Sequence, residues 1–119
     1  MATDRYPADL VLDAYLLRAM AVAGFAPSFS VCARCGAEGP HTWFSVPTGG
    51  MVCSSCRAPG SVRAGAGTVA LLSALLTSDW STALTATPTE RNEAHGMVAA
   101  YVPWHLDRGL RSLRHVQRA

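Results

Sequence analysis

Four cysteines, the only ones in the chain, form two closely spaced pairs. Cys32 and Cys35 make the first pair, and after a gap of seventeen residues Cys53 and Cys56 make the second. Each Cys-x-x-Cys pair can turn two sulfur atoms toward one ion, and two such pairs at this separation are typical of zinc held by four thiolates. The sequence therefore predicts one zinc ion per chain, with these four cysteines as its ligands.

A zinc ion with four protein ligands has no open position for water, so we expect it to stabilise the fold and not to catalyse hydrolysis. His41 lies between the pairs, but four thiolates already complete the shell. Two other interpretations remain. A thioredoxin-like redox pair should lie between a strand and a long helix, and a secreted disulfide framework should be richer in cysteine. A zinc measurement separates these alternatives.

The residues between the cysteine pairs favour a β-hairpin. The runs 42–46 (Thr-Trp-Phe-Ser-Val) and 51–53 (Met-Val-Cys) are rich in β-formers, and Pro47-Thr48-Gly49-Gly50 between them supplies a turn. We therefore predict a zinc ribbon at about residues 30–58.

The chain has 119 residues, of which 50% are hydrophobic, so it can form one compact domain with its own core. We predict that residues 1–119 form a single, mainly α-helical domain into which the ribbon is inserted. The apolar run 10–26 is interrupted by Asp13 and Arg18, which argues against a membrane span. Cysteines held by zinc and the lack of a cleavable leader predict a cytoplasmic protein.

The first predicted helix covers residues 8–23. Pro7 suits the start of a helix, Asp9 suits the dipole of its first turn, and Gly24 is a typical C-cap. The helical period places one apolar face toward the core. This predicted face contains Leu10, Val11, Ala14, Tyr15, Leu17 and Ala21.

A second helix is predicted from Thr68, its expected N-cap, after flexible links at 58–60 and 65–67. It is apolar almost all round, which indicates either central burial or a position beneath a groove that a partner fills. The stretch 80–86 is compatible with either a short helical turn or a loop.

A third helix is predicted from the capping box Thr87-Pro88-Thr89-Glu90, with an apolar face at Ala94, Met97, Val98 and Tyr101. Pro103 removes a hydrogen bond to the carbonyl of Ala99, so we expect the helix to bend or end there. Gly109 is predicted to be a second breaker. A short basic segment at 110–114 follows.

The net charge of the chain is too small to attract nucleic acid strongly. The formal charge of +2 falls to about zero once four thiolates and Zn²⁺ replace four neutral thiols. The basic residues gather at the end of the chain, because residues 107–119 contain four of the ten arginines and one acid. No phosphate loop, nucleophile elbow or paired-carboxylate site is present, and His105 suits a hydrogen-bonded core position, so the sequence predicts no enzyme.

Several motifs together resemble the C-terminal domain of the RecO recombination-mediator family. They are the Tyr-Leu-Leu-Arg helix at 15–18, Gly-Phe-Ala-Pro at 24–27, the cysteine ribbon with Phe-Ser and Gly-Gly at 44–45 and 49–50, Tyr-x-x-x-His-Leu at 101–106, and Leu-Arg-Ser-Leu-Arg at 110–114. The resemblance covers nearly the whole chain. The N-terminal OB-fold of that family has no counterpart here, and Pro103 and Asp107 depart from the family pattern.

The resemblance implies a non-enzymatic adaptor in DNA repair, one that binds RecR and the acidic, apolar-tipped C-terminal tail of SSB and assists loading of RecA on single-stranded DNA. It also implies association with the nucleoid, and we expect this fragment to bind single-stranded DNA only weakly. An acidic peptide with an aromatic end requires an apolar slot rimmed by arginine. Candidate rim residues are Arg18, Arg111 and Arg114, and candidate walls are Leu17, Leu72, Leu76 and Tyr101.

The alternative function is a zinc-ribbon module that binds nucleic acid directly. Its face would contain His41, Trp43 and Phe44, flanked by Arg34 and Arg57. Two flanking arginines give little charge for binding phosphates. The enzyme alternative is a thiol oxidoreductase that uses the cysteine pairs.

Overall fold

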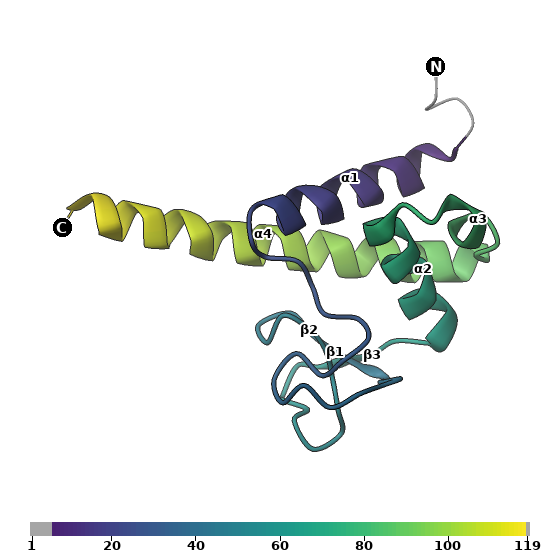
Figure 1. The fold of residues 1–119 in the computed structure, drawn as a ribbon, viewed down its shortest axis with the longest axis horizontal. Coiled ribbons are helices and arrows are strands. Elements are labelled where there is room, and N and C mark those ends of the chain that lie inside the picture. Colours follow the sequence, from purple (N-terminus) through teal and green to yellow (C-terminus); the bar gives the residue numbers. More distant parts are fainter. Residues whose placement is uncertain (1–5, 119) are drawn as a thin grey trace.

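The computed structural model describes the backbone of residues 6–118 and the side chains of residues 6–111. Within these limits the protein is mainly helical, with a small antiparallel sheet beneath the helices, as predicted (Figure 1). The elements in order are α1 (Ala8–Val22), β1 (Trp43–Ser45), β2 (Gly50–Val52), β3 (Val62–Arg63), α2 (Ala66–Thr77), α3 (Trp80–Ala83) and α4 (Pro88–Arg118).

The helices pack around a core to which α1, α2 and α4 all contribute. Helices α1 and α4 run in the same direction, side by side, and α2 contacts both of them (Figure 1). Two polar pairs connect α1 to α4, one helical turn apart. Arg91 Nε donates to Asp9 Oδ2 at 3.1 Å, and His95 Nδ1 donates to Asp13 Oδ1 at 2.9 Å.

Local signals fix both ends of α1. Pro7 precedes the first turn, and a Schellman motif ends the helix, because Gly24 N–H donates to Ala21 O at 3.1 Å and Phe25 N–H donates to Met20 O at 2.8 Å. Gly24 adopts φ +91°, a left-handed conformation that favours glycine. The predicted role of Gly24 at the helix end is therefore confirmed.

The predicted apolar face of α1 is only partly correct. Leu10, Ala14 and Leu17 are buried, and Met20 completes the buried face. Ala21 and Tyr15 were predicted to lie on this face but are exposed, Tyr15 at 68%. The helix turns them away from α2 and α4, so apolar character alone did not indicate burial.

Helix α2 begins earlier than predicted. Its N-cap is Gly65, and Thr68 is a buried residue inside the helix. The cause is tertiary, since Glu93 of α4 accepts the Gly65 N–H at 3.1 Å and Glu90 lies against Gly67, which has no side chain in the way. Two carboxylates from α4 thus stabilise the positive end of α2. The link predicted at 65–67 is largely helical.

The connection from α2 to α4 contains a short helix, which answers the question left open for residues 80–86. Ser78 ends α2 in the left-handed conformation with φ +62°. Asp79 then caps α3 by accepting the N–H of Thr82 at 3.3 Å. The capping box that starts α4 forms as predicted, with Glu90 N–H donating to Thr87 Oγ1 at 3.2 Å and Thr87 N–H donating to Glu90 Oε1 at 2.9 Å.

The prediction for the end of this helix was wrong. Helix α4 continues through Pro103 and Gly109 as one rod to Arg118 (Figure 1). Ala99 and Pro103 both lie on the exposed side, so water can solvate the carbonyl that loses its helical partner. Gly109 packs against the ring of Phe25, where a Cβ would lie 3.1 Å from Phe25 Cζ.

The predicted hairpin is present, with a third strand that was not predicted. Strand β1 pairs antiparallel with β2, Phe44 opposite Met51, and on its other edge with β3, Trp43 opposite Arg63. Further pairing at Ser28 and Gly50 extends the ribbon toward the helices. A two-residue strand containing an arginine gives no alternating pattern that sequence analysis can detect.

Candidate metal centre and partner surface

The four cysteine sulfur atoms meet at one end of the ribbon. All four lie within 4.8 Å of one another, and Cys35 Sγ and Cys53 Sγ are 3.8 Å apart. Zinc–sulfur bonds of about 2.3 Å in a tetrahedron place sulfur atoms about 3.8 Å apart. The four residues predicted as ligands therefore fit a tetrahedral metal ion of zinc's size.

Backbone hydrogen bonds hold each cysteine pair in a tight turn. Cys35 N–H points at Cys32 Sγ at 3.5 Å, and Gly36 N–H donates to Cys32 O at 2.9 Å. Gly36 has φ +79°, which a residue with a side chain rarely adopts. In the second pair, Cys56 N–H donates to Cys53 O at 3.1 Å. The sulfur positions are thus set by the backbone.

Without a bound cation, the four thiols differ in how readily they lose a proton. The Cys35 N–H directed at Cys32 lowers the pKa of that thiol to about 5, whereas hydrogen bonding to Cys53 raises the pKa of Cys56 to about 12. Four adjacent thiolates repel one another, and a divalent cation between them removes this penalty. The centre has the chemistry of a metal site.

Two contacts attach the ribbon to α4. The ring of Phe44, 3% exposed, lies 6.1 Å from that of Tyr101, and His105 Nε2 donates to Val46 O at 2.6 Å. Tyr101 also donates its hydroxyl to Phe25 O at 2.7 Å, and burial raises its pKa to about 12. His105 is half-buried and hydrogen-bonded, as predicted, but its partner in the ribbon could not be predicted from the sequence.

The ribbon face considered for nucleic acid is smaller than the sequence suggested. Phe44 points into the core, and His41 Nε2 bonds to Ala37 O at 2.8 Å. Arg57 lies over the ring of Trp43, 4.3 Å from its centroid, and Arg63 is paired with Trp43 from β3. Trp43 is therefore the remaining aromatic residue of that predicted face.

Most residues predicted as walls of a partner slot belong to the interior. Leu17, Leu72 and Tyr101 are at most 2% exposed, and Leu76 is partly buried against the same core. They come close together, with Leu17, Leu72 and Tyr101 beside Phe44, but they surround packed core and not an open slot.

The three candidate rim arginines are separated. Arg18 lies on α1 and is exposed. Arg111 lies on the distal part of α4, where its Nε is 3.0 Å from Asp107 Oδ2 and its side chain is 72% exposed. The side chain of Arg114 lies outside the described residues.

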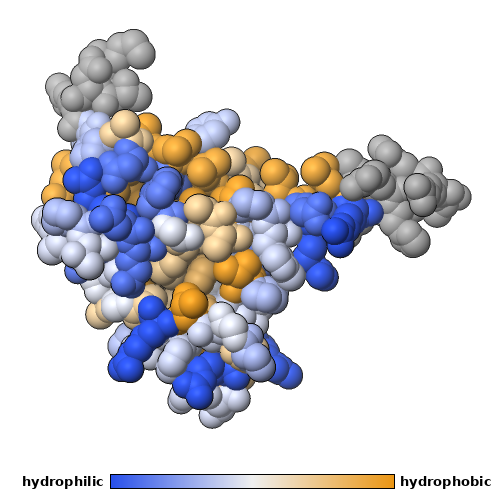
Figure 2. All heavy atoms as spheres, turned by 180° about the vertical axis from the view of Figure 1, so that it is seen from behind, coloured by the Kyte–Doolittle hydropathy of each residue, from blue (hydrophilic) through white to orange (hydrophobic). Residues whose placement is uncertain are grey.

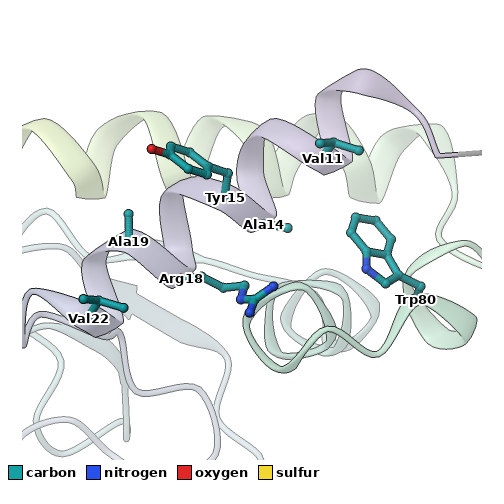
Figure 3. A pocket seen from close by; sticks show the side chains of 7 residues that line it. All are labelled: Val11, Ala14, Tyr15, Arg18, Ala19, Val22 and Trp80. Carbon is teal, nitrogen blue, oxygen red and sulfur yellow. The ribbon is translucent and has the colours of Figure 1, made fainter. Parts of the chain in front are cut away.

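An open groove lies on the outer side of α1, facing α3, with a volume of about 400 Å³ (Figure 3). Arg18 extends into it from α1, and the ring of Trp80 stands opposite, stacked on Tyr6 with centroids 4.3 Å apart. The remaining wall is apolar. Its residues are Val11, Ala14, Tyr15, Ala19 and Val22. Sequence analysis selected Arg18 but missed Trp80.

The fold and the site define a small, mainly helical domain with an inserted β-ribbon whose four clustered cysteines could hold a metal ion. The family model "Recombination protein O C terminal" matches residues 2–114. The chain belongs to this family.

Three named relatives illustrate the match. "DNA repair protein RecO" of Streptomyces avermitilis is 54% identical over 99% of the chain and 48% of that protein. The proteins of the same name from Thermobifida fusca and Nocardioides sp. are 53% and 52% identical, over 100% and 99% of the chain and 49% and 50% of those proteins. The chain thus spans about half the length of these relatives. No solved structure gave a significant match.

Within residues 6–118, no helix is both long enough and apolar enough to cross a membrane.

Proposed function

We propose that this chain is a non-enzymatic adaptor of DNA repair and recombination, and that it binds the acidic C-terminal tail of SSB in the groove between α1 and α3. One observation supports this most strongly. The groove combines an apolar wall with a single arginine, Arg18, and an indole, Trp80 (Figure 3).

The chemistry of the groove suits a peptide that ends in an aromatic residue. The terminal ring requires an apolar surface, and Trp80 and Tyr15 offer aromatic faces for it. The free carboxylate requires a cation, because a carboxylate taken out of water without one is costly. Arg18 is the arginine in the wall, so we assign the terminal carboxylate to it. Arg111 and Arg114 on α4 serve acids further along the peptide.

A titration of a labelled SSB tail peptide against the chain at low salt tests this proposal. Arg18→Ala should weaken binding by about 1.5 to 3 kcal/mol, the range for a hydrogen bond to a charged group, or roughly 10- to 150-fold in Kd. Trp80→Ala should also weaken it. Arg34→Ala, an exposed arginine in the ribbon, is the matched control and should have no effect.

Two results would contradict this assignment: no binding at low salt, or equal affinities for the Arg18→Ala and Arg34→Ala variants. If only Arg111→Ala abolished binding, the peptide site would lie on the distal part of α4 and not in the groove.

The metal in the cysteine centre is proposed to be zinc, one ion per chain, in a structural role. The four sulfur ligands and the full tetrahedron favour zinc over metals that prefer oxygen. Metal analysis of the reduced, purified chain checks this assignment. Well under one zinc per chain, together with an ordered ribbon, would exclude it.

Membership of the RecO family supports a proposal for the remaining partners. We propose that the chain binds RecR and assists RecA loading, and that it does so in the cytoplasm near the nucleoid. We also propose that residues 1–119 act as one helical domain with the ribbon inserted at about 30–58. DNA binding by the chain alone should be weak and should fall steeply with salt, because a metal-loaded chain has almost no net charge. A salt titration with single-stranded DNA measures this.

A further inference from the structure

The distal part of α4, residues 104–111, is a helix that its own sequence does not favour. Pro103 has no N–H, so the carbonyl of Ala99 loses its helical hydrogen bond at the point where this stretch begins. Gly109 weakens the helix again six residues later. The C-terminal end of α4 projects beyond α1 and beyond the ribbon (Figure 1). Something outside the local sequence must support the stretch.

Contacts within the stretch give little support. Asp107 and Arg111 form an exposed ion pair one turn apart, and Arg108 lies 4.7 Å above the ring of Trp104. Exposed pairs of this kind stabilise a helix only slightly. The stabilisation from these two pairs is too small to compensate for both the missing backbone hydrogen bond and the internal glycine.

Two residues of the stretch, His105 and Gly109, contact other parts of the protein: His105 reaches the ribbon, and Gly109 reaches Phe25 at the end of α1. His105 Nε2 donates to Val46 O at 2.6 Å, the one hydrogen bond from described residues 104–111 to another element. The ring of Phe25 packs on Gly109. Phe25 begins the segment that enters the ribbon, where Ser28 N–H donates to Gly49 O at 2.9 Å.

The position of Val46 depends in turn on the cysteine centre. Val46 directly follows β1, which is held by β2, and Cys53 directly follows β2. The first cysteine pair is tied to the same strand, because Ala33 N–H donates to Met51 O at 2.7 Å. Many small zinc-binding domains fold only when their ligands hold a metal. A continuous path of bonds therefore joins the four sulfurs to His105.

We propose that the cysteine centre is a latch for α4: with metal bound, the ribbon holds residues 104–111 helical through His105, and without metal this stretch frays from Pro103 onward. The latch determines whether Arg108 and Arg111 are displayed on a rigid rod. This inference does not depend on the assignment of the groove.

Hydrogen exchange on the full chain, before and after removal of metal with EDTA, tests the latch. We expect the amides of residues 104–111 to exchange at least tenfold faster after removal, while those of residues 92–101, which pack against α1 and α2, keep most of their protection. Equal exchange of residues 104–111 in the two states would overturn the proposal.

Substitutions locate the coupling at His105. In the metal-loaded chain, His105→Ala should speed exchange in 104–111 about as much as metal removal does, and His105→Gln, which keeps an amide donor, should restore part of the protection. His41→Ala is the matched control, because this histidine bonds to Ala37 within the ribbon. The proposal would be wrong if His105→Ala left the exchange of residues 104–111 unchanged, or if His41→Ala accelerated it as much as His105→Ala does.

Pro103→Ala tests the proposal without altering the ribbon. It restores the backbone donor for Ala99 O, so after metal removal the 104–111 amides of this variant should exchange several-fold more slowly than those of the wild-type chain. No slowing would show that Pro103 is not the point at which α4 frays.

Discussion

The helical body and the cysteine end of the ribbon are stabilised in different ways. The body buries a continuous cluster of leucine, alanine, methionine and valine side chains from α1, α2 and α4. The ribbon adds Phe44 and Met51 to that cluster, but residues 34–40 at its cysteine end are all exposed. Figure 2, seen from behind, shows apolar residues gathered over the helices and a largely polar surface below them.

This difference indicates which forces act where. The body gains stability from apolar area removed from water, which depends on shape and volume. The cysteine end has almost no such area, so we expect its order to depend on the metal ion proposed for its four sulfur atoms. One chain therefore contains a part that chelators should leave folded and a part that they should unfold.

Metal removal should have the largest effect. Structural zinc sites bind with an apparent free energy of about 10 to 16 kcal/mol at neutral pH, and that free energy is also folding free energy for the site. We expect EDTA, or Cys53→Ser, to disorder residues 32–56 while α1 and α2 stay helical. Dispersed backbone NMR signals from the ribbon after metal loss would contradict the comparison.

A truncation in the body should come next. Leu75 is fully buried, so Leu75→Ala should lower the free energy of unfolding by about 2 to 5 kcal/mol through lost burial and a residual cavity. Urea denaturation followed by circular dichroism measures this. Leu12→Ala on the exposed side of α1 is the control and should change stability by about 0.5 kcal/mol or less.

The two polar pairs between α1 and α4 should give pH effects of opposite sign on the free energy of unfolding. Burial raises the pKa of the Asp13 carboxyl above 3.8, an effect that His95 partly offsets. The folded state therefore takes up a proton on Asp13 at higher pH than the unfolded chain does. Above its raised pKa, the buried Asp13 carboxylate therefore lowers the free energy of unfolding. This destabilisation disappears as the pH falls through the raised pKa and the carboxylate takes up a proton.

Asp9 behaves in the opposite way, because its hydrogen bond from Arg91 lowers its pKa below 3.8. Its contribution is present above the unfolded pKa and is lost as the pH falls through the lowered folded value. The free energy of unfolding should be measured against pH for two variants. In Asp13→Asn, it should decline less than in the wild-type chain as the pH rises. In Asp9→Asn, it should fall less than in the wild-type chain as the pH is lowered. Identical profiles in both variants would refute the assignment.

The smallest effect is expected at the ribbon surface. Arg57 stacks on Trp43 at an exposed site, where a cation–π contact contributes about 0.5 to 1 kcal/mol. Arg57→Ala should therefore speed the loss of metal to a competing chelator by a few-fold at most. A larger change, or the same change in Arg34→Ala, would mean that arginine charge near the sulfurs matters more than stacking.

The sequence alone determined the features that depend on residues close together in the chain. The cysteine pairs with Gly36, the hairpin turn at 47–50, the end of α1 at Gly24 and the capping box at Thr87 each need only a few neighbouring residues. Their hydrogen bonds close within about five positions, so residue type and spacing are sufficient to predict them.

The tertiary structure decided everything that requires a distant partner. Glu90 and Glu93 of α4 moved the start of α2 to Gly65, and packing placed Leu17, Leu72 and Tyr101 in the interior while leaving a groove between Arg18 and Trp80. His105 and Val46, 59 residues apart, meet beyond a proline that should have ended the helix. Local propensity costs a few kcal/mol at most, and contacts between elements far apart in the chain can exceed it.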